Sequence, residues 1–189
     1  MKTLLHLCAA ISLLTIAGCV TPKPSAPSAL CGIRDLDGPP IPENFTGTLS
    51  KTRRTRAATH VVQVNSVETA CCPTFDRVVF DFDGLRLPPV YTVEYFDGPV
   101  TQCGSGQNVP ITGSAKLKIT FDTAQAHTEA GQATITSRNR RLNCPNLRHL
   151  VVTCDFEGKV EVVLGLNAKR PYRAVELLND SKLVIDVKH

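Results

Sequence analysis

The sequence is poor in several features that mark particular classes of protein. It contains no tryptophan, one methionine and only 5% aromatic residues, which argues against broad aromatic platforms that stack sugars or bases. Its 21 basic and 17 acidic residues leave a formal net charge of +4, well short of the basic stripe of a dedicated nucleic-acid binder. We therefore expect no nucleic-acid partner. The 189 residues, 42% of them hydrophobic, indicate one globular domain with extensions.

Motifs for catalysis and metal binding are missing too. The sequence has no G-x-S-x-G elbow, phosphate loop or dinucleotide fingerprint, and its cysteines lack the C-x-x-C spacing of a zinc site. We expect no catalytic residue, no metal and no cofactor. One alternative is a cell-wall hydrolase, in which two carboxylates about 5–9.5 Å apart would act as acid and base. The carboxylates available for that pair are Asp76, Asp81, Asp83 and Glu157.

The longest apolar run lies near the N-terminus and is too short to span a membrane. It covers residues 4–17, whereas a transmembrane helix needs about 20 apolar residues, so residues 1–18 are typical of a signal peptide. Residues 16–19 (Ile-Ala-Gly-Cys) resemble the bacterial lipobox, which implies cleavage before Cys19 and a membrane anchor of acyl chains on that residue. Val20, in place of an aspartate, favours the periplasmic face of the outer membrane over the inner membrane. The alternative is an ordinary secretory signal.

Cysteine usage fits an exported protein. Of eight cysteines, Cys8 leaves with the signal peptide and Cys19 takes the lipid. The remaining six are Cys31, Cys71, Cys72, Cys103, Cys144 and Cys154. An even number in an oxidising compartment favours three disulfides, for which fifteen pairings are open. We expect no bond between the adjacent Cys71 and Cys72, and we expect Cys31 to pin the N-terminal arm.

The stretch before the domain has the composition of a linker. Residues 21–48 are rich in proline and small residues, which favours an extended spacer, and residues 50–59 carry four basic residues and no acidic one. We divide the chain into a signal peptide (1–18), a lipidated cysteine with a Pro-rich and basic linker (19–59) and a folded domain (60–189).

Alternating hydrophobicity dominates the rest of the chain. In residues 75–82, Val78, Phe80 and Phe82 alternate with other residues, as in a strand with one buried face. Further strands are indicated over residues 90–96, 115–121, 150–156, 160–166 and 183–187. Turn signals separate them, and helix is indicated only weakly, over 123–130. The pattern predicts an all-β sandwich of short antiparallel strands, with little helix and with disulfide staples.

Two of these segments have the same order of residue types. Residues 77–82 and 182–187 both run basic, apolar, Val, apolar, Asp, apolar. If the two strands pair antiparallel, Arg77 would oppose Asp186 and Lys182 would oppose Asp81. We expect such pairs to lie on an exposed face, where each contributes a few tenths of a kcal/mol to about 1 kcal/mol.

Several of the motifs form an ordered series. They are residues 75–82 (FDRVVFDF), 91–95 (YTVEY), 104–106 (GSG), 113–117 (GSAKL), 155–158 (DFEG), 165–166 (GL) and 183–187 (LVIDV). Together they resemble the AMIN-like domain of bacterial exported proteins and lipoproteins, over about residues 61–189. The resemblance implies a non-catalytic β-sandwich that binds peptidoglycan or directs proteins to the cell envelope. The cysteines in residues 71–154 depart from the family pattern.

Basic clusters are the candidate ligand-binding residues. They are Arg53, Arg54 and Arg56 in the linker, Arg138, Arg140 and Arg141, and Lys169 with Arg170. Arginine binds carboxylates bidentately, and peptidoglycan stem peptides carry carboxylates. The leading interpretation is a lipid-anchored envelope module that binds peptidoglycan or an envelope protein. The alternative from another class is a protein-interaction or inhibitor lipoprotein, in which an open sheet edge takes up a partner strand.

Overall fold

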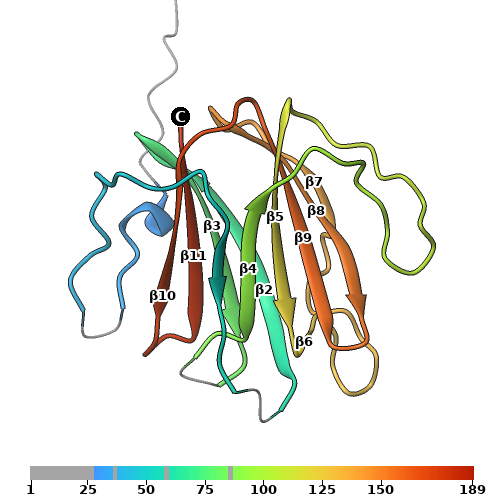
Figure 1. Cartoon of the computed structure of the whole chain (residues 1–189). Helices are drawn as coiled ribbons and strands as arrows, with labels where there is room; N and C mark the ends of the chain where they lie inside the picture. The colour runs from blue at the N-terminus through green and yellow to red at the C-terminus, as the bar shows by residue number, and fades with distance from the viewer. Residues whose placement is uncertain (1–27, 36–37, 58–59, 85–86) are drawn as a thin grey trace, which may run out of the picture.

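The computed structural model describes residues 28–35, 38–57, 60–84 and 87–189. Two sheets pack face to face as a sandwich (Figure 1). One sheet has the order β1-β4-β5-β9-β8-β7 and the other β10-β11-β3-β2-β6. The elements are η1 (Ala29–Gly32), β1 (Thr52–Arg54), β2 (Val62–Cys71), β3 (Phe75–Phe82), β4 (Val90–Tyr95), β5 (Ala115–Asp122), β6 (Ala124–Gln125), β7 (Asn139–Arg141), β8 (Leu147–Phe156), β9 (Lys159–Leu166), β10 (Tyr172–Leu177) and β11 (Lys182–Lys188).

The expected all-β sandwich is confirmed, and its core follows from the alternation in the sequence. Strand β5 turns Leu117, Ile119 and Phe121 inward, and all three are fully buried. The ring of Phe121 packs edge-on against Phe80 and Phe82 of the opposite sheet, with centroid distances of 4.9 and 5.4 Å. Period-2 burial on both sheets therefore builds one core between them.

Six expected strands are present, and five are additional. The additional strands are β1, β2, β6, β7 and β10. The weak expectation of helix over 123–130 is wrong, because Ala124–Gln125 form β6, which pairs parallel with the start of β2. Thr123 just before it has φ 58°, a left-handed conformation that cannot continue a helix.

The linker expectation is wrong for residues 28–35 and 38–57, because they pack against the sandwich. Strand β1 pairs with β4, and Thr48 pairs with Tyr172 at the start of β10. Ile41 packs with Val79 and Val184 on the outer face of the five-stranded sheet. Strand β3 is therefore buried on both faces, although its sequence indicated only one. Apolar side chains in the N-terminal arm (residues 28–35 and 38–48) cover the second face.

The antiparallel register of β3 and β11 is confirmed, but the expected exposure of one pair is wrong. Arg77 opposes Asp186, and Lys182 opposes Asp81. Lys182 and Asp81 form a partly exposed ion pair at 3.0 Å. In contrast, the side chains of Arg77 and Asp186 are 0% exposed and 2.7 Å apart. Arg77 also donates to the carbonyl oxygens of Leu30 and Cys31, so the N-terminal arm shields this ion pair from water.

Three disulfides tie the arm and loops to the sheets, as expected. The bonds are Cys31–Cys72, Cys71–Cys144 and Cys103–Cys154, so the adjacent Cys71 and Cys72 are not bonded to each other. The first holds η1 at the end of β2, and the second joins the two sheets. The third fastens the β4–β5 connection to β8. Each closes more than forty residues of chain and contributes about 2–4 kcal/mol.

The expected signal peptide and the lipidation at Cys19 lie outside the described residues. Within the described part of the chain, no helix has the length and apolar character needed to cross a membrane.

Candidate functional site

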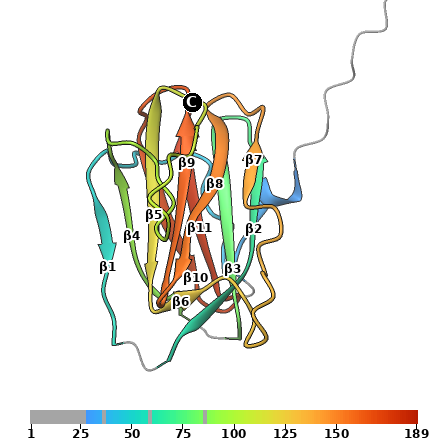
Figure 2. The same cartoon turned by 90° about the vertical axis from the view of Figure 1, so that its right-hand side faces the viewer.

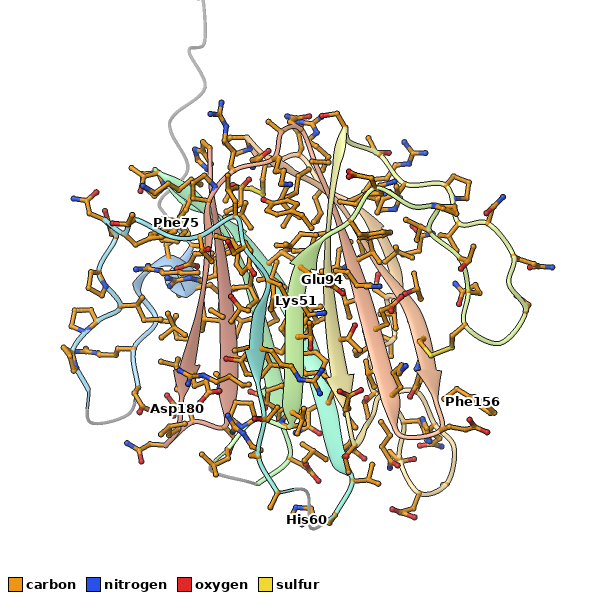
Figure 3. The ribbon with its side chains drawn as sticks, in the orientation of Figure 1. Lys51, His60, Phe75, Glu94, Phe156 and Asp180 are labelled. Carbon is orange, nitrogen blue, oxygen red and sulfur yellow. A yellow bond between two sulfur atoms is a disulfide. The ribbon has the colours of Figure 1, made fainter. Side chains whose placement is uncertain are left out.

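Basic side chains gather at one end of the sandwich, where β7, β9 and β11 finish. This basic end, near Phe75 in Figure 3, includes the β7–β8 loop, the β9–β10 loop and the residues after β11. Acidic residues are absent from 130–154 and from 162–175, the two stretches that supply most of it. The basic residues here are Arg141, Arg148, Lys169, Arg170 and Lys188.

A buried carboxylate fixes the loops of the basic end. Asp76 at the start of β3 accepts hydrogen bonds from the backbone N–H groups of Asn146 and Leu147, at 2.7 and 2.6 Å. Its other oxygen lies 3.0 Å from Nε2 of His189. The side chain of Asp76 is 0% exposed, so its charge acts within the fold and does not neutralise the surface.

Asn146 connects the β7–β8 loop to the β9–β10 loop and to the end of β11. Its side-chain amide donates to the carbonyl of Lys188 at 2.8 Å, and its amide oxygen accepts from the backbone N–H of Ala168 at 2.9 Å. The β7–β8 loop thus holds both the β9–β10 loop and the end of β11. Backbone and amide groups make these contacts, and of the five basic side chains Arg148 also bonds to the β7–β8 loop, at the Cys144 carbonyl.

The five basic side chains of this end form no ion pair with a described carboxylate. Arg141 donates to the Thr112 hydroxyl at 3.2 Å, and Arg148 donates to a backbone carbonyl. Lys169 lies over the ring of Tyr95 at 5.2 Å, and Lys188 lies over that of Phe45 at the same distance. Arg141, Lys169 and Arg170 are exposed, so their charges face solvent and are available to an anionic ligand.

The cluster Arg138, Arg140 and Arg141 expected from the sequence is divided by the structure. Arg138 pairs with Asp155 at 2.5 Å, at the opposite end of β8. Arg140 reaches across to β2 and donates to the Val67 carbonyl at 2.9 Å. Only Arg141 joins Lys169 and Arg170 at the basic end. The period of two along β7 separates the residues, since Arg140 and Arg141 point to opposite faces.

Two members of the basic end were not among the sequence candidates. Arg148 and Lys188 lie on β8 and β11, just outside the expected strands 150–156 and 183–187. The acid-free composition of 130–154 is a signal that would have included Arg148. No feature of the sequence would have included Lys188. It joins the basic end only because the ends of β3, β8 and β11 meet in space.

The carboxylates considered for a hydrolase serve separate structural contacts. Asp76 lies at the basic end, and Asp81 pairs with Lys182. Asp83 accepts from the backbone N–H of Gln63 at 2.9 Å, and Glu157 lies in the β8–β9 turn of the other sheet. One group of metal-ligand atoms is compact, formed by Cys71, Asp76 and Cys144. Its two sulfur atoms are already bonded to each other, so they are not thiolate ligands.

The strand arrangement and the disulfide-bonded loops define a two-sheet β-sandwich domain. The sequence model of the AMIN-like domain family matches residues 62–189, about two thirds of the chain. The chain therefore belongs to the AMIN-like domain family. Comparison with curated proteins and with solved structures gave no match.

Proposed function

We propose that this protein is a lipid-anchored, non-catalytic binding module of the bacterial cell envelope whose basic end binds the carboxylates of peptidoglycan stem peptides. The observation that carries the proposal is a set of basic side chains that form no ion pair with a described carboxylate, at the end of the sandwich whose loops Asp76 and Asn146 hold. Membership of the AMIN-like family supports the envelope setting. Of the residues first considered as ligands, Arg141, Lys169 and Arg170 belong to this surface.

The chemistry of these groups suits a polymer that carries many carboxylates. Arginine presents a rigid fork of N–H donors that matches a carboxylate, and lysine adds a flexible point charge. Each exposed pair contributes about 0.2–1 kcal/mol, so useful affinity requires several contacts at once. A repeating anionic polymer supplies those contacts, and the binding is expected to weaken with salt because exposed charges are screened.

The short segment between Cys19 and the N-terminal arm limits how far such a module can move from its membrane. Only residues 20–27 lie between Cys19 and Ser28, where the described structure begins. A lipid on Cys19 would therefore keep Ser28 within about 30 Å of the membrane surface, even for a fully extended chain. The Cys31–Cys72 bond places η1 beside the end of β2. The proposed module is thus a short-range connector between the membrane and the wall.

Co-sedimentation of the purified, oxidised chain with sacculi tests the proposal. We expect saturable binding that weakens as salt is raised. The triple variant R141A/K169A/R170A should bind about tenfold more weakly, since three exposed contacts of about 0.5 kcal/mol each amount to roughly one decade in Kd.

The matched control removes the same number of positive charges elsewhere. Lys51, Arg53 and Lys159 are exposed and lie outside the basic end, so K51A/R53A/K159A should retain nearly full binding. Equal losses in both triple variants would mean that net charge alone drives the association. Failure of the wild-type chain to pellet at low salt would refute the proposal.

A further inference from the structure

One side of the sandwich is left open between β2 and β7. Figure 2 shows both strands on the same side of the molecule. Strand β2 pairs with β3 along most of its length, but its other neighbour, β6, covers only Val62 and Gln63. The segment of β2 from Val67 to Cys71 therefore has one unpaired edge.

The direction of the free backbone groups follows from the register. Cys72 donates its N–H to the Phe75 carbonyl. The backbone N–H and C=O groups of every second residue back along β2 therefore point toward β3, and those of the residues between point away from it. The outward positions are Val67, Thr69 and Cys71. Apart from the Val67 carbonyl, which accepts from Arg140, no described group bonds to the outward N–H and C=O groups of these residues. Such an edge is a template for another strand.

A polar hollow lies beside this edge. Its volume is about 150 Å³, enough for a small side chain or several water molecules. The lining residues are Ser66, Val67, Thr134, Ile135, Thr136, Ser137 and Arg140. They come from β2 on one sheet and from β7 with its preceding segment on the other. A side chain from a strand added to β2 would therefore meet hydroxyl groups and one guanidinium.

Arg140 gives the hollow its charge. Its guanidinium carries five N–H donors, of which one binds the Val67 carbonyl, and its Nε is buried with no hydrogen-bond partner. Burial lowers the pKa of Arg140, and the nearby Glu68 partly offsets that effect. A half-buried guanidinium with unused donors favours a carboxylate ligand.

We infer that the edge of β2 from Val67 to Cys71 binds an extended segment of a partner protein, and that an acidic side chain of that segment occupies the hollow and pairs with Arg140. The backbone of the segment would continue the five-stranded sheet. Recognition by strand addition combines main-chain hydrogen bonds, which give affinity, with pockets for alternate side chains, which give specificity. This site is separate from the basic end and does not depend on the proposed binding of peptidoglycan.

A peptide titration followed by NMR tests the inference on the isotope-labelled, oxidised full chain. The probes are the acetylated, amidated pentapeptides Ser-Val-Glu-Val-Thr and Ser-Val-Gln-Val-Thr. We expect the glutamate peptide to shift the amide signals of Val67, Thr69 and Cys71 saturably and to bind about fivefold more tightly than the glutamine peptide, because charged hydrogen bonds are stronger. Glu68→Gln should strengthen binding of the glutamate peptide by removing a competing carboxylate.

Two variants separate the side-chain and backbone parts of the site. Arg140→Gln should abolish the preference for glutamate, whereas the matched control Arg141→Gln, one residue further along β7, should retain it. Thr69→Pro should abolish binding of both peptides, since it removes an outward donor without removing a bond to β3, and edge strands tolerate such a proline. An unchanged unfolding midpoint verifies that Thr69→Pro is folded.

Three results would overturn the inference. The first is the absence of saturable shifts at the three edge amides up to the solubility limit of the peptides. The second is equal affinity for the two peptides. The third is a set of shifts that grows with protein concentration without any peptide, which would show that two copies of the chain pair through β2.

Discussion

The two ends of the sandwich use their charges differently. At the basic end, a buried carboxylate and a side-chain amide hold the loops, and the surrounding lysine and arginine side chains face solvent without acidic partners. At the far end, near His60 and Asp180 in Figure 3, charged groups themselves hold the chain. There Asp155 accepts from the Ala126 backbone N–H and pairs with Arg138 and His127.

The far end also exposes apolar side chains at its loop tips. They are Val61, Leu87, Phe156 and Leu178, each between 40 and 60% exposed. They come from four separate stretches of the chain, and Phe156 among them is the last residue of β8. The charged groups that hold the far end are already paired within the fold, whereas those of the basic end have no acidic partner among the described residues, and for this reason we propose the basic end as the ligand-binding surface.

The largest expected effect comes from breaking the support of the basic end. Asp76→Ala removes the one carboxylate oxygen that accepts both buried backbone N–H groups and leaves these two donors unsatisfied. We expect the free energy of unfolding to fall by about 3 kcal/mol, measured by urea denaturation. Binding to sacculi should weaken as well, although Asp76 itself does not reach the surface. Unchanged stability would contradict its role in fixing the loops.

Breaking the far end should cost somewhat less stability and leave binding intact. Asp155→Asn removes the ionised partner of Arg138 and His127, and we expect a loss of about 2 kcal/mol. The control variant is Glu157→Gln, because Glu157 is an exposed residue in the neighbouring turn. This substitution should lower the free energy of unfolding by less than about 0.5 kcal/mol. A loss of sacculus binding in Asp155→Asn would contradict the separation of the two ends.

Acid should affect the two ends in different pH ranges. His149 belongs to the first, because it opposes Arg141 of the basic end in the β7–β8 register. Burial, with a smaller effect from Arg141, lowers the pKa of His149 below 6.5, and its ring nitrogens contact the Thr112 N–H and the Asn139 side chain. As pH falls, His149 is therefore protonated in the unfolded chain before it is protonated in the folded chain. The free energy of unfolding should fall as pH drops below 6.5. His149→Gln should flatten the stability curve in that range.

The far end should respond only at lower pH. Burial alone would raise the pKa of Asp155, but hydrogen bonds from Ala126, Arg138 and His127 lower it below 3.8. The stability from this carboxylate is present above 3.8 and is lost as pH falls through the lower pKa of the folded state. Thermal unfolding across pH in wild type and Asp155→Asn measures it. A loss of the Asp155 contribution near pH 6 would contradict the assignment.

The smallest expected effect on stability is the most informative for function. The substitutions R141A/K169A/R170A should change the free energy of unfolding by less than about 0.5 kcal/mol, because exposed basic groups without an ion-pair partner contribute little to folding. Measured beside the weaker binding expected for the same variant, this result would show that these charges serve a ligand. A large loss of stability would mean that the basic groups are structural.

Alternation is a local property, so the sequence predicted β3, β4, β5, β8, β9 and β11, but it did not indicate β1, β2, β6, β7 or β10. It also predicted that Arg77 opposes Asp186, since two short strands of matching pattern have a natural antiparallel register. The sequence did not reveal that this ion pair is buried. The residues that cover the pair belong to the N-terminal arm, more than forty residues before Arg77 in the chain. The disulfide partners were open for the same reason, as pairing depends on which loop ends meet in space.

The candidate site was predictable only in part. Three neighbouring arginines suggested one cluster, but alternation along β7 sends Arg140 and Arg141 to opposite faces, and Arg138 reaches Asp155. That separation could have been inferred once β7 was recognised as a strand, yet three residues are too few to show a period. The open edge of β2 depends on where β6 stops, which no local pattern encodes.

The most direct measurement of the central claim is amide hydrogen exchange of the oxidised chain, free and bound to purified sacculi. The account predicts that sacculi slow exchange in the loops 142–146 and 167–171, while the far-end turns 156–158 and 178–181 exchange as in the free protein. Slowed exchange confined to the far-end turns, or no change at either end under binding conditions, would contradict the claim that the basic end is the wall-binding surface.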